Sequence, residues 1–215
     1  MSFFVESSGG GFQNCPPGMH LARNYQIIDL GTQKDNRNGV VEFKHRITLT
    51  WEILSKSEDG TPLRMTDGRP FSVNKRYNLT WAERSTLRND LQSWRGRPFT
   101  NEELRKFDLK RVLGQYCMIN VLHNTSKNGK VYANVEQITP VPGMIKGAGL
   151  PPGVNPDVIF NLSDPDMNVF ESLTPWLKKT IQESPEWQKL NGKTALVDPD
   201  QSLRDAEEYL DQVPF

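Results

Sequence analysis

The longest regular pattern in the chain lies between residues 41 and 54, where apolar and polar residues alternate without a break. Successive side chains of a β-strand point to opposite faces, so the pattern predicts a strand with one buried and one solvated face. Trp51 lies on the apolar side, whereas Lys44 and Arg46 lie on the polar side. Because the stretch exceeds a usual strand of about 5 to 6 residues, we expect it to bend and serve two neighbours, as in a small barrel. An ordinary strand of a β-sandwich explains this stretch equally well.

Four further stretches have the alternation or the composition of strands, and they span residues 23–30, 70–79, 116–123 and about 131–140. Thr80 and Thr100 each begin a capping-box pattern, which predicts helices over 80–96 and 100–114. The fold class is therefore predicted to be mainly β (α+β). The expected architecture is a five-stranded barrel of the oligonucleotide-binding type, the OB-fold, with a helical insertion between strands 3 and 4. It requires a closed sheet between Tyr25 and Ile138, and a sandwich is the alternative.

The predicted organisation has four parts. They are a flexible N-terminal arm (1–20), the OB-fold domain (21–142), a linker with a short helical extension (143–190) and a disordered acidic tail (191–215). A helical stripe of apolar residues runs through 169–181. The extension is too short to fold alone, so we expect it to pack on the barrel or on another subunit.

The zero net charge hides two oppositely charged parts. Residues 1–150 carry 21 − 14 = +7, and residues 151–215 carry 5 − 12 = −7. A basic body suits a polyanion, and an acidic end can compete for the same surface or recruit another protein. No run of eighteen apolar residues exists, so no membrane span is predicted. The start of the chain lacks the pattern of an export signal and only two cysteines occur, which favours a reducing cytoplasm.

The acidic segment before the last residue ends in Pro214 and Phe215. This ending resembles the tail of bacterial single-stranded DNA-binding proteins, although Gln212 and Val213 stand where acids are expected. The resemblance implies that Asp211, Pro214 and Phe215 dock on partner proteins. An aromatic ring would fill an apolar pocket of the partner while the acids meet its basic residues.

Residues 87–121 resemble a segment of bacteriophage-encoded proteins of the single-stranded DNA-binding type. The two resemblances together imply a phage protein that coats single-stranded DNA during replication, recombination or repair. It would work in the cytoplasm of the host cell and recruit replication or recombination proteins through its tail. A homo-oligomer is compatible with this interpretation.

Binding of single strands without sequence preference needs cations for the phosphates and aromatic faces for the bases. The predicted DNA-binding residues are Lys44, Arg46, Trp51, Lys75, Arg76, Tyr77, Arg95, Arg97, Lys127, Lys130 and Tyr132. Trp51 has the parity of the apolar face, so packing in the core is its alternative role. The basic and aromatic segment 94–99 either contacts the backbone of DNA or is simply a helix end followed by a proline.

The sequence offers little for catalysis. The three histidines are isolated, the two cysteines have no companions at ligand spacing, and no phosphate-binding glycine loop or nucleophile motif occurs. We therefore expect no enzyme activity, no catalytic residues, no metal and no cofactor. Two other functions remain open. One is a protein-interaction or structural phage component without nucleic-acid binding, which would assemble through the 169–181 stripe. The other is a nuclease or other enzyme on a barrel scaffold.

Overall fold

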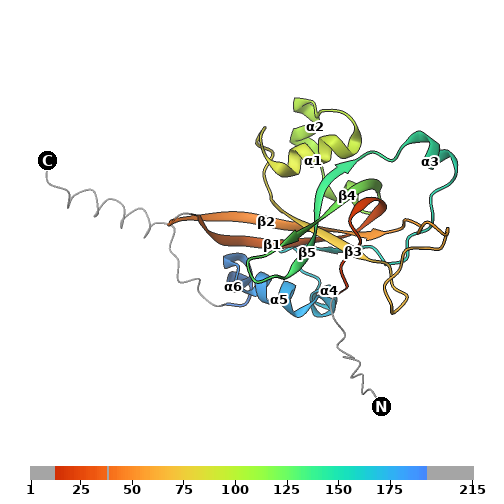
Figure 1. Ribbon diagram of the computed structural model, residues 1–215. Coiled ribbons are helices and arrows are strands. Elements are labelled where there is room, and N and C mark those ends of the chain that lie inside the picture. The colour runs from red at the N-terminus through yellow and green to blue at the C-terminus, as the bar shows by residue number, and fades with distance from the viewer. Residues whose placement is uncertain (1–12, 38, 193–215) are drawn as a thin grey trace, which may run out of the picture. The chain divides into compact units, whose positions relative to one another are not determined.

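The computed structural model describes residues 13–37 and 39–192. Its elements in chain order are β1 (Gly18–Arg37), β2 (Val40–Ile53), β3 (Ser72–Asn78), α1 (Thr86–Arg95), α2 (Asn101–Lys106), the 3-10 helix η1 (Leu109–Val112), β4 (Tyr116–Thr125), β5 (Val131–Thr139), α3 (Gly143–Gly147), β6 (Val158–Phe160), α4 (Met167–Ser172), α5 (Pro175–Gln182) and α6 (Pro185–Leu190) (Figure 1). No helix among the described residues is long and apolar enough to span a membrane.

The chain forms two compact units, and both receive part of the β1–β2 hairpin. In the part that the structure describes, unit 1 contains 13–28 and 47–159, and unit 2 contains 29–46 and 160–192. The predicted boundary near residue 142 lies before this division, because residues 143–159 belong to unit 1. It does not anticipate that the outer half of the hairpin groups with the extension.

The strands form one antiparallel sheet with the order β3-β2-β1-β4-β5, and β6 pairs with β1 outside this path. The mainly β class is therefore confirmed. The hydrogen-bonded sheet is open between β3 and β5, so the closed barrel is not shown. Two details differ from expectation. β1 is longer than the predicted strand at both ends, and β6 was not predicted because its three residues are too few for a recognisable pattern.

The second half of β2 is buried on both faces. Its apolar face packs in the core of unit 1 through Ile47, Leu49, Trp51 and Ile53, as the alternation predicts. The opposite face, with Thr48, Thr50 and Glu52, is also buried, although the pattern predicts a solvated face there. The prediction is wrong for this half: a later segment of the chain, described below, covers Glu52, and Thr50 donates to the Gln26 side chain.

The insertion between β3 and β4 contains α1, α2 and η1. The Thr100 capping box is present, since the hydroxyl accepts from the Glu103 N–H and the Glu103 carboxylate accepts from the Thr100 N–H. The Thr80 box is wrong, because α1 begins six residues later with Ser85 as its N-cap. Gly96 ends α1 with φ +74°, in the left-handed region that favours glycine.

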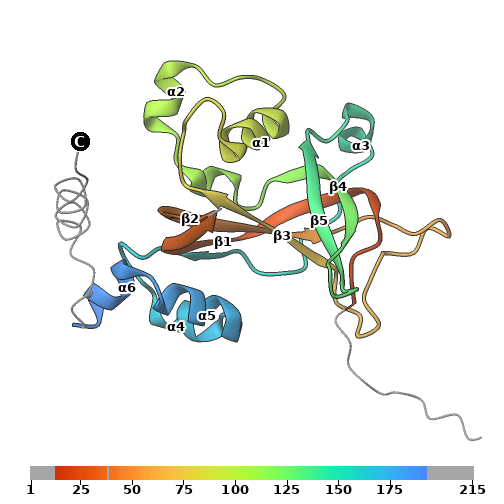
Figure 2. The same ribbon diagram turned by 60° about the vertical axis from the view of Figure 1, so that its left-hand side comes forward.

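In unit 2, helices α4, α5 and α6 lie beneath the outer half of the hairpin (Figure 2). Their aromatic side chains form a core. Phe170 and Trp187 stack with ring centroids 4.2 Å apart, and Phe160 packs against both. Gly31 of β1 lies so close to α6 that a Cβ there would be 2.6 Å from the Ser184 Cβ. Of the predicted 169–181 stripe, Leu173, Leu177 and Ile181 are buried and Val169 is partly buried, whereas Trp176 is 51% exposed. Most of the stripe is therefore unavailable for the oligomer seam that the structural-component hypothesis requires.

A histidine between two carboxylates ties β2 to its neighbours in unit 2. His45 Nε2 lies 2.6 Å from Asp29 Oδ1, and its Nδ1 lies 3.8 Å from Glu186 Oε1. The hydrogen bond to Asp29 raises the pKa of His45 above its ordinary value, and the charges of both carboxylates act in the same direction. Glu186 is in turn held by Thr32, whose hydroxyl and N–H donate to it at 2.5 and 2.9 Å.

The raised pKa makes the stability of unit 2 depend on pH. The protonated ring stabilises the folded state fully below the ordinary histidine pKa of about 6.5, and this contribution is lost as the pH rises through the folded-state pKa. Since the side chain is 34% exposed, we expect a loss of about 1 kcal/mol or less. Thermal melts at pH values from below the ordinary histidine pKa to above the folded-state pKa should show this loss of stability. The variant His45→Gln should show a smaller change of stability with pH. An equal slope in both proteins would contradict the prediction.

Candidate nucleic-acid interface

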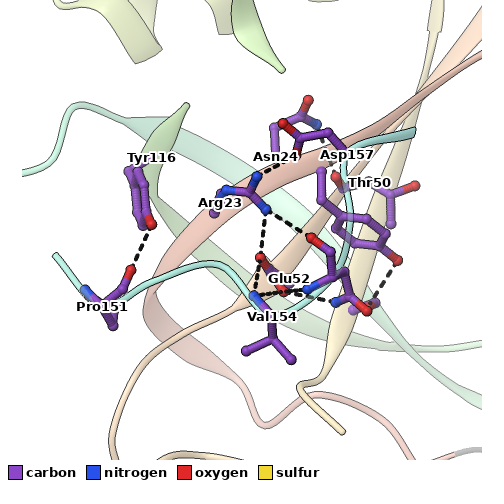
Figure 3. A network of polar contacts seen from close by, with 11 residues as sticks. Arg23, Asn24, Thr50, Glu52, Tyr116, Pro151, Val154 and Asp157 are labelled. Carbon is purple, nitrogen blue, oxygen red and sulfur yellow. Dashed lines mark hydrogen bonds and ion pairs between the residues drawn. The ribbon is translucent and has the colours of Figure 1, made fainter. Parts of the chain in front are cut away.

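A segment after α3 is bound across the sheet by the buried carboxylate of Glu52 (Figure 3). Glu52 accepts hydrogen bonds from the N–H groups of Val154 and Asn155 at 3.1 and 2.8 Å, and from the Asn155 side chain at 2.8 Å. Arg23 donates to the same carboxylate at 2.9 Å. Tyr116 donates to the carbonyl of Pro151 at 2.6 Å. These bonds hold residues 151–157, which we call the strap, over the outer sides of β1 and β2.

The strap and α3 together close part of the outer face of the sheet. A small apolar cluster lies beneath them, formed by Leu21, Leu54 and Val141 with Tyr116, Met118, Ile145 and Leu150. The Gly and Pro residues of this region predict a loose link, but Glu52 accepts from two of its N–H groups. Arg23 and Tyr116 donate to the carbonyls of Asn155 and Pro151. The rest of the outer face, near the turn between β4 and β5, remains exposed.

This exposed part, the β4–β5 outer face, has side chains that alternate with those of the core. Pairing of β4 with β5 sets Leu122 beside Asn134 and Asn124 beside Tyr132, while Met19 of β1 pairs with Asn120. The full set is Met19, Asn120, Leu122, Asn124, Tyr132, Asn134 and Gln137. The neighbouring residues Val121 and Val135 point into the core instead.

Three of these side chains expose apolar surface. Met19 is 52% exposed, Leu122 42% and Tyr132 47%. Among the described residues no group hydrogen-bonds to the Tyr132 hydroxyl. The amide side chains around them supply hydrogen-bond donors and acceptors. The face therefore combines an aromatic ring, aliphatic side chains and amides, with no charged residue among them.

Cations lie at the end of the same hairpin. Lys127 and Lys130 flank the turn, in which Gly129 adopts φ +74°, and both are exposed without an ion-pair partner in residues 13–37 and 39–192. Glu136 is the only acid between residues 116 and 139. The chemistry of the face and its end suits a chain of phosphates with unpaired bases, because bases stack on aromatic rings and phosphates attract Lys.

No family model matches the chain, and no curated protein is significantly similar to it. The assignment of a function therefore depends on the geometry of the predicted residues.

Two predicted aromatic contacts are part of the core. Trp51 is fully buried and packs against Trp94 with ring centroids 5.9 Å apart, so it cannot stack on a base. Tyr77 is 2% exposed and donates its hydroxyl to Asp90 at 2.8 Å. Burial, with the negative charge of Asp90, raises the pKa of Tyr77. Both predictions are corrected, since the period-2 pattern places these rings on the interior side.

Several predicted cations are already neutralised. Lys75 lies 2.7 Å from Asp90 in unit 1. In unit 2, Lys44 pairs with Glu42, and Arg46 pairs with Asp35 at 2.7 Å. Arg76 is exposed on β3. The sequence identifies such residues as basic, but it does not show which acid lies beside each one.

The basic segment 94–99 is mainly a helix end. Arg95 and Arg97 both contact the Glu103 carboxylate, at 2.6 and 2.7 Å, and they lower its pKa through these hydrogen bonds. The Arg95 guanidinium also lies 4.3 Å from the ring centroid of Phe99. A pocket of about 580 Å³ adjoins them, and its wall includes the further cations Lys106, Arg111 and Lys146.

The structure and the sequence agree on Lys127, Lys130 and Tyr132 as neighbours on one exposed hairpin. Met19, Leu122 and the surrounding amides were not identified from the sequence as candidate DNA-binding residues. A signal existed, because both alternating sets of residues 116–123 are partly apolar, and one apolar set of a half-buried strand must be solvated or covered. Asp211, Pro214 and Phe215 lie outside the described residues, so their role as a partner-binding tail stays a prediction.

Proposed function

We propose that this protein binds single-stranded DNA without reading its sequence, through an OB-type barrel. The strand order supports the barrel: its end strands β3 and β5 have residues within 8 Å of each other, measured between Cα atoms. Helix α1 lies between them in contact, since Asp90 accepts from Tyr77 of β3 and Ser93 donates to the Ile138 carbonyl of β5. An OB-fold has its helix at this point of the chain.

The observation that carries the proposal is the β4–β5 outer face with its cationic end. An exposed Tyr132 and the apolar residues Met19 and Leu122 form a surface on which bases can stack, with Lys127 and Lys130 exposed beside it. Stacking contributes on the order of 1 to 3 kcal/mol per base and tolerates any sequence. Such a protein would serve replication, recombination or repair.

The direct test is fluorescence anisotropy of a labelled oligothymidine strand at low salt, titrated with the full chain. Binding should weaken as salt is added, because cations are released from the phosphates. Quenching of tryptophan is a poor readout, since Trp51, Trp94 and Trp187 are buried and the exposed Trp176 lies on α5 rather than on the β4–β5 outer face. Unchanged anisotropy at low salt would reject the proposal and favour a protein-interaction role.

The acidic segment is proposed to recruit replication or recombination proteins and to compete with DNA. Residues 205–215 contain four acids and no base. Deletion of this segment is therefore expected to leave DNA binding unchanged or to tighten it, because a competing polyanion is removed. The same titration measures the effect, and clearly weaker binding by the truncated protein would contradict it.

A further inference from the structure

The first half of β2 differs from the second half in that its apolar residues are exposed. Val40, Val41 and Phe43 are 61%, 44% and 53% exposed, whereas Ile47 and Leu49 are buried. Val41 and Phe43 point to the same face of the strand. Exposed apolar residues on a strand are common at positions where another strand adds to a sheet.

One edge of this half-strand has no partner strand among residues 13–37 and 39–192. The Ile53 N–H donates to the Phe71 carbonyl, which aligns β2 with the start of β3. In an antiparallel pair, residues further along one strand face residues further back along the other. Asn78, seven residues after Phe71, therefore lies opposite Arg46, seven residues before Ile53. Asn78 is the last residue of β3, so β3 ends opposite Arg46, and residues 40–45 continue beyond it.

The free edge also has a defined hydrogen-bonding direction. Since Ile53 directs its N–H toward β3, alternate residues of β2 direct their N–H and C=O groups to the same edge. These residues are Val41, Phe43 and His45. They present the pattern of donors and acceptors that an antiparallel strand needs.

We propose that this edge pairs with the same edge of a second copy of the chain, antiparallel, with Phe43 opposite Phe43. The two copies would then exchange hydrogen bonds at Phe43, and Val41 would face His45 of the second copy. On the other face, Glu42 of each copy lies directly opposite Lys44 of the other. A two-fold axis brings opposite charges together twice, so the edge is complementary to itself.

The charges favour a second copy over an unrelated strand. In a pair without a hydrogen bond the two side chains are closest, which is where Glu42 and Lys44 meet. Within one chain the same two residues already form an ion pair on that face. Lys on an edge usually prevents pairing, but here each Lys meets an acid in the symmetric arrangement. The proposal does not rest on DNA binding, because it uses only residues of the β2 edge.

Sedimentation of the full chain without DNA tests the proposal, up to concentrations of about 100 μM where weak dimers form. A concentration-dependent dimer is expected. Glu42→Lys places Lys opposite Lys, and Lys44→Glu places Glu opposite Glu, so either change should raise the dimer dissociation constant about tenfold or more. The double change E42K/K44E restores opposite charges and should restore the dimer. Phe43→Ser should weaken it through loss of the apolar contact.

The control is Glu136→Lys, which alters net charge as E42K does but lies on β5. It should leave the dimer unchanged, and circular dichroism of each variant verifies that the fold is kept. A protein that stays monomeric at every concentration overturns the proposal. So does a dimer that is indifferent to E42K and K44E, or one that the double change fails to restore.

Discussion

Replacement of Glu52 by Ala is expected to lower the free energy of unfolding by about 3 to 5 kcal/mol, because it removes one partner of a buried charge pair. The Glu52 side chain is fully buried, and Arg23 beside it is only 13% exposed. Loss of the carboxylate leaves the N–H groups of Val154 and Asn155 without acceptors as well. Urea denaturation measures the change.

The matched control is Asp157→Ala. Asp157 contacts the same Arg23, but its side chain is 42% exposed, so we expect a loss of about 1 kcal/mol or less. Glu52→Gln keeps the shape and part of the accepting capacity and should fall between the two. Hydrogen exchange gives a local readout, since the amides of Val154 and Asn155 should exchange faster in Glu52→Ala. Equal stability of Glu52→Ala and Asp157→Ala would refute the role assigned to Glu52.

The strap shows why only part of the fold could be predicted from the sequence. The alternation of β2 gives its inner face correctly, since Ile47, Leu49 and Trp51 are in the core. The same pattern cannot show that Glu52, on the polar side, is buried by residues about a hundred positions later. A period-2 pattern shows which side chains of a strand share a face. Contacts with distant parts of the chain decide which of the two faces is exposed to water.

The site was only partly predictable for the same reason. Lys127, Lys130 and Tyr132 lie on one hairpin, so local pairing is enough to bring them together. Lys75, Arg95 and Arg97 looked equally suitable, but their acids Asp90 and Glu103 approach through the packing of the helical insertion. Basic residues in a sequence indicate available charge, and only the fold shows whether that charge remains unpaired.

Tyr132→Ala is expected to weaken binding of oligothymidine by roughly 5-fold to 150-fold, which corresponds to a stacking contribution of about 1 to 3 kcal/mol. Tyr132→Phe should bind almost normally, because it keeps the ring and loses only the hydroxyl. The matched control is Trp176→Ala, which removes an aromatic side chain that is 51% exposed but lies on α5. Fluorescence anisotropy at constant salt measures all three, and equal affinities for Tyr132→Ala and Trp176→Ala would exclude stacking on Tyr132.

The lysines at the end of the hairpin should act through salt dependence instead. For single strands the slope of log K against log salt changes by about 0.7 for each phosphate contact, so Lys127→Ala with Lys130→Ala should reduce it by about 1.4. Lys179→Ala on α5, with a side chain 77% exposed, should leave the slope unchanged. An unchanged slope in the double variant would show that the two lysines do not contact phosphates of the DNA, even if a base stacks on Tyr132. Together the two variant sets distinguish a surface that binds both bases and phosphates from one that only attracts polyanions. Tyr132→Ala removes the ring without changing the charge, so it weakens binding only if bases stack on this surface.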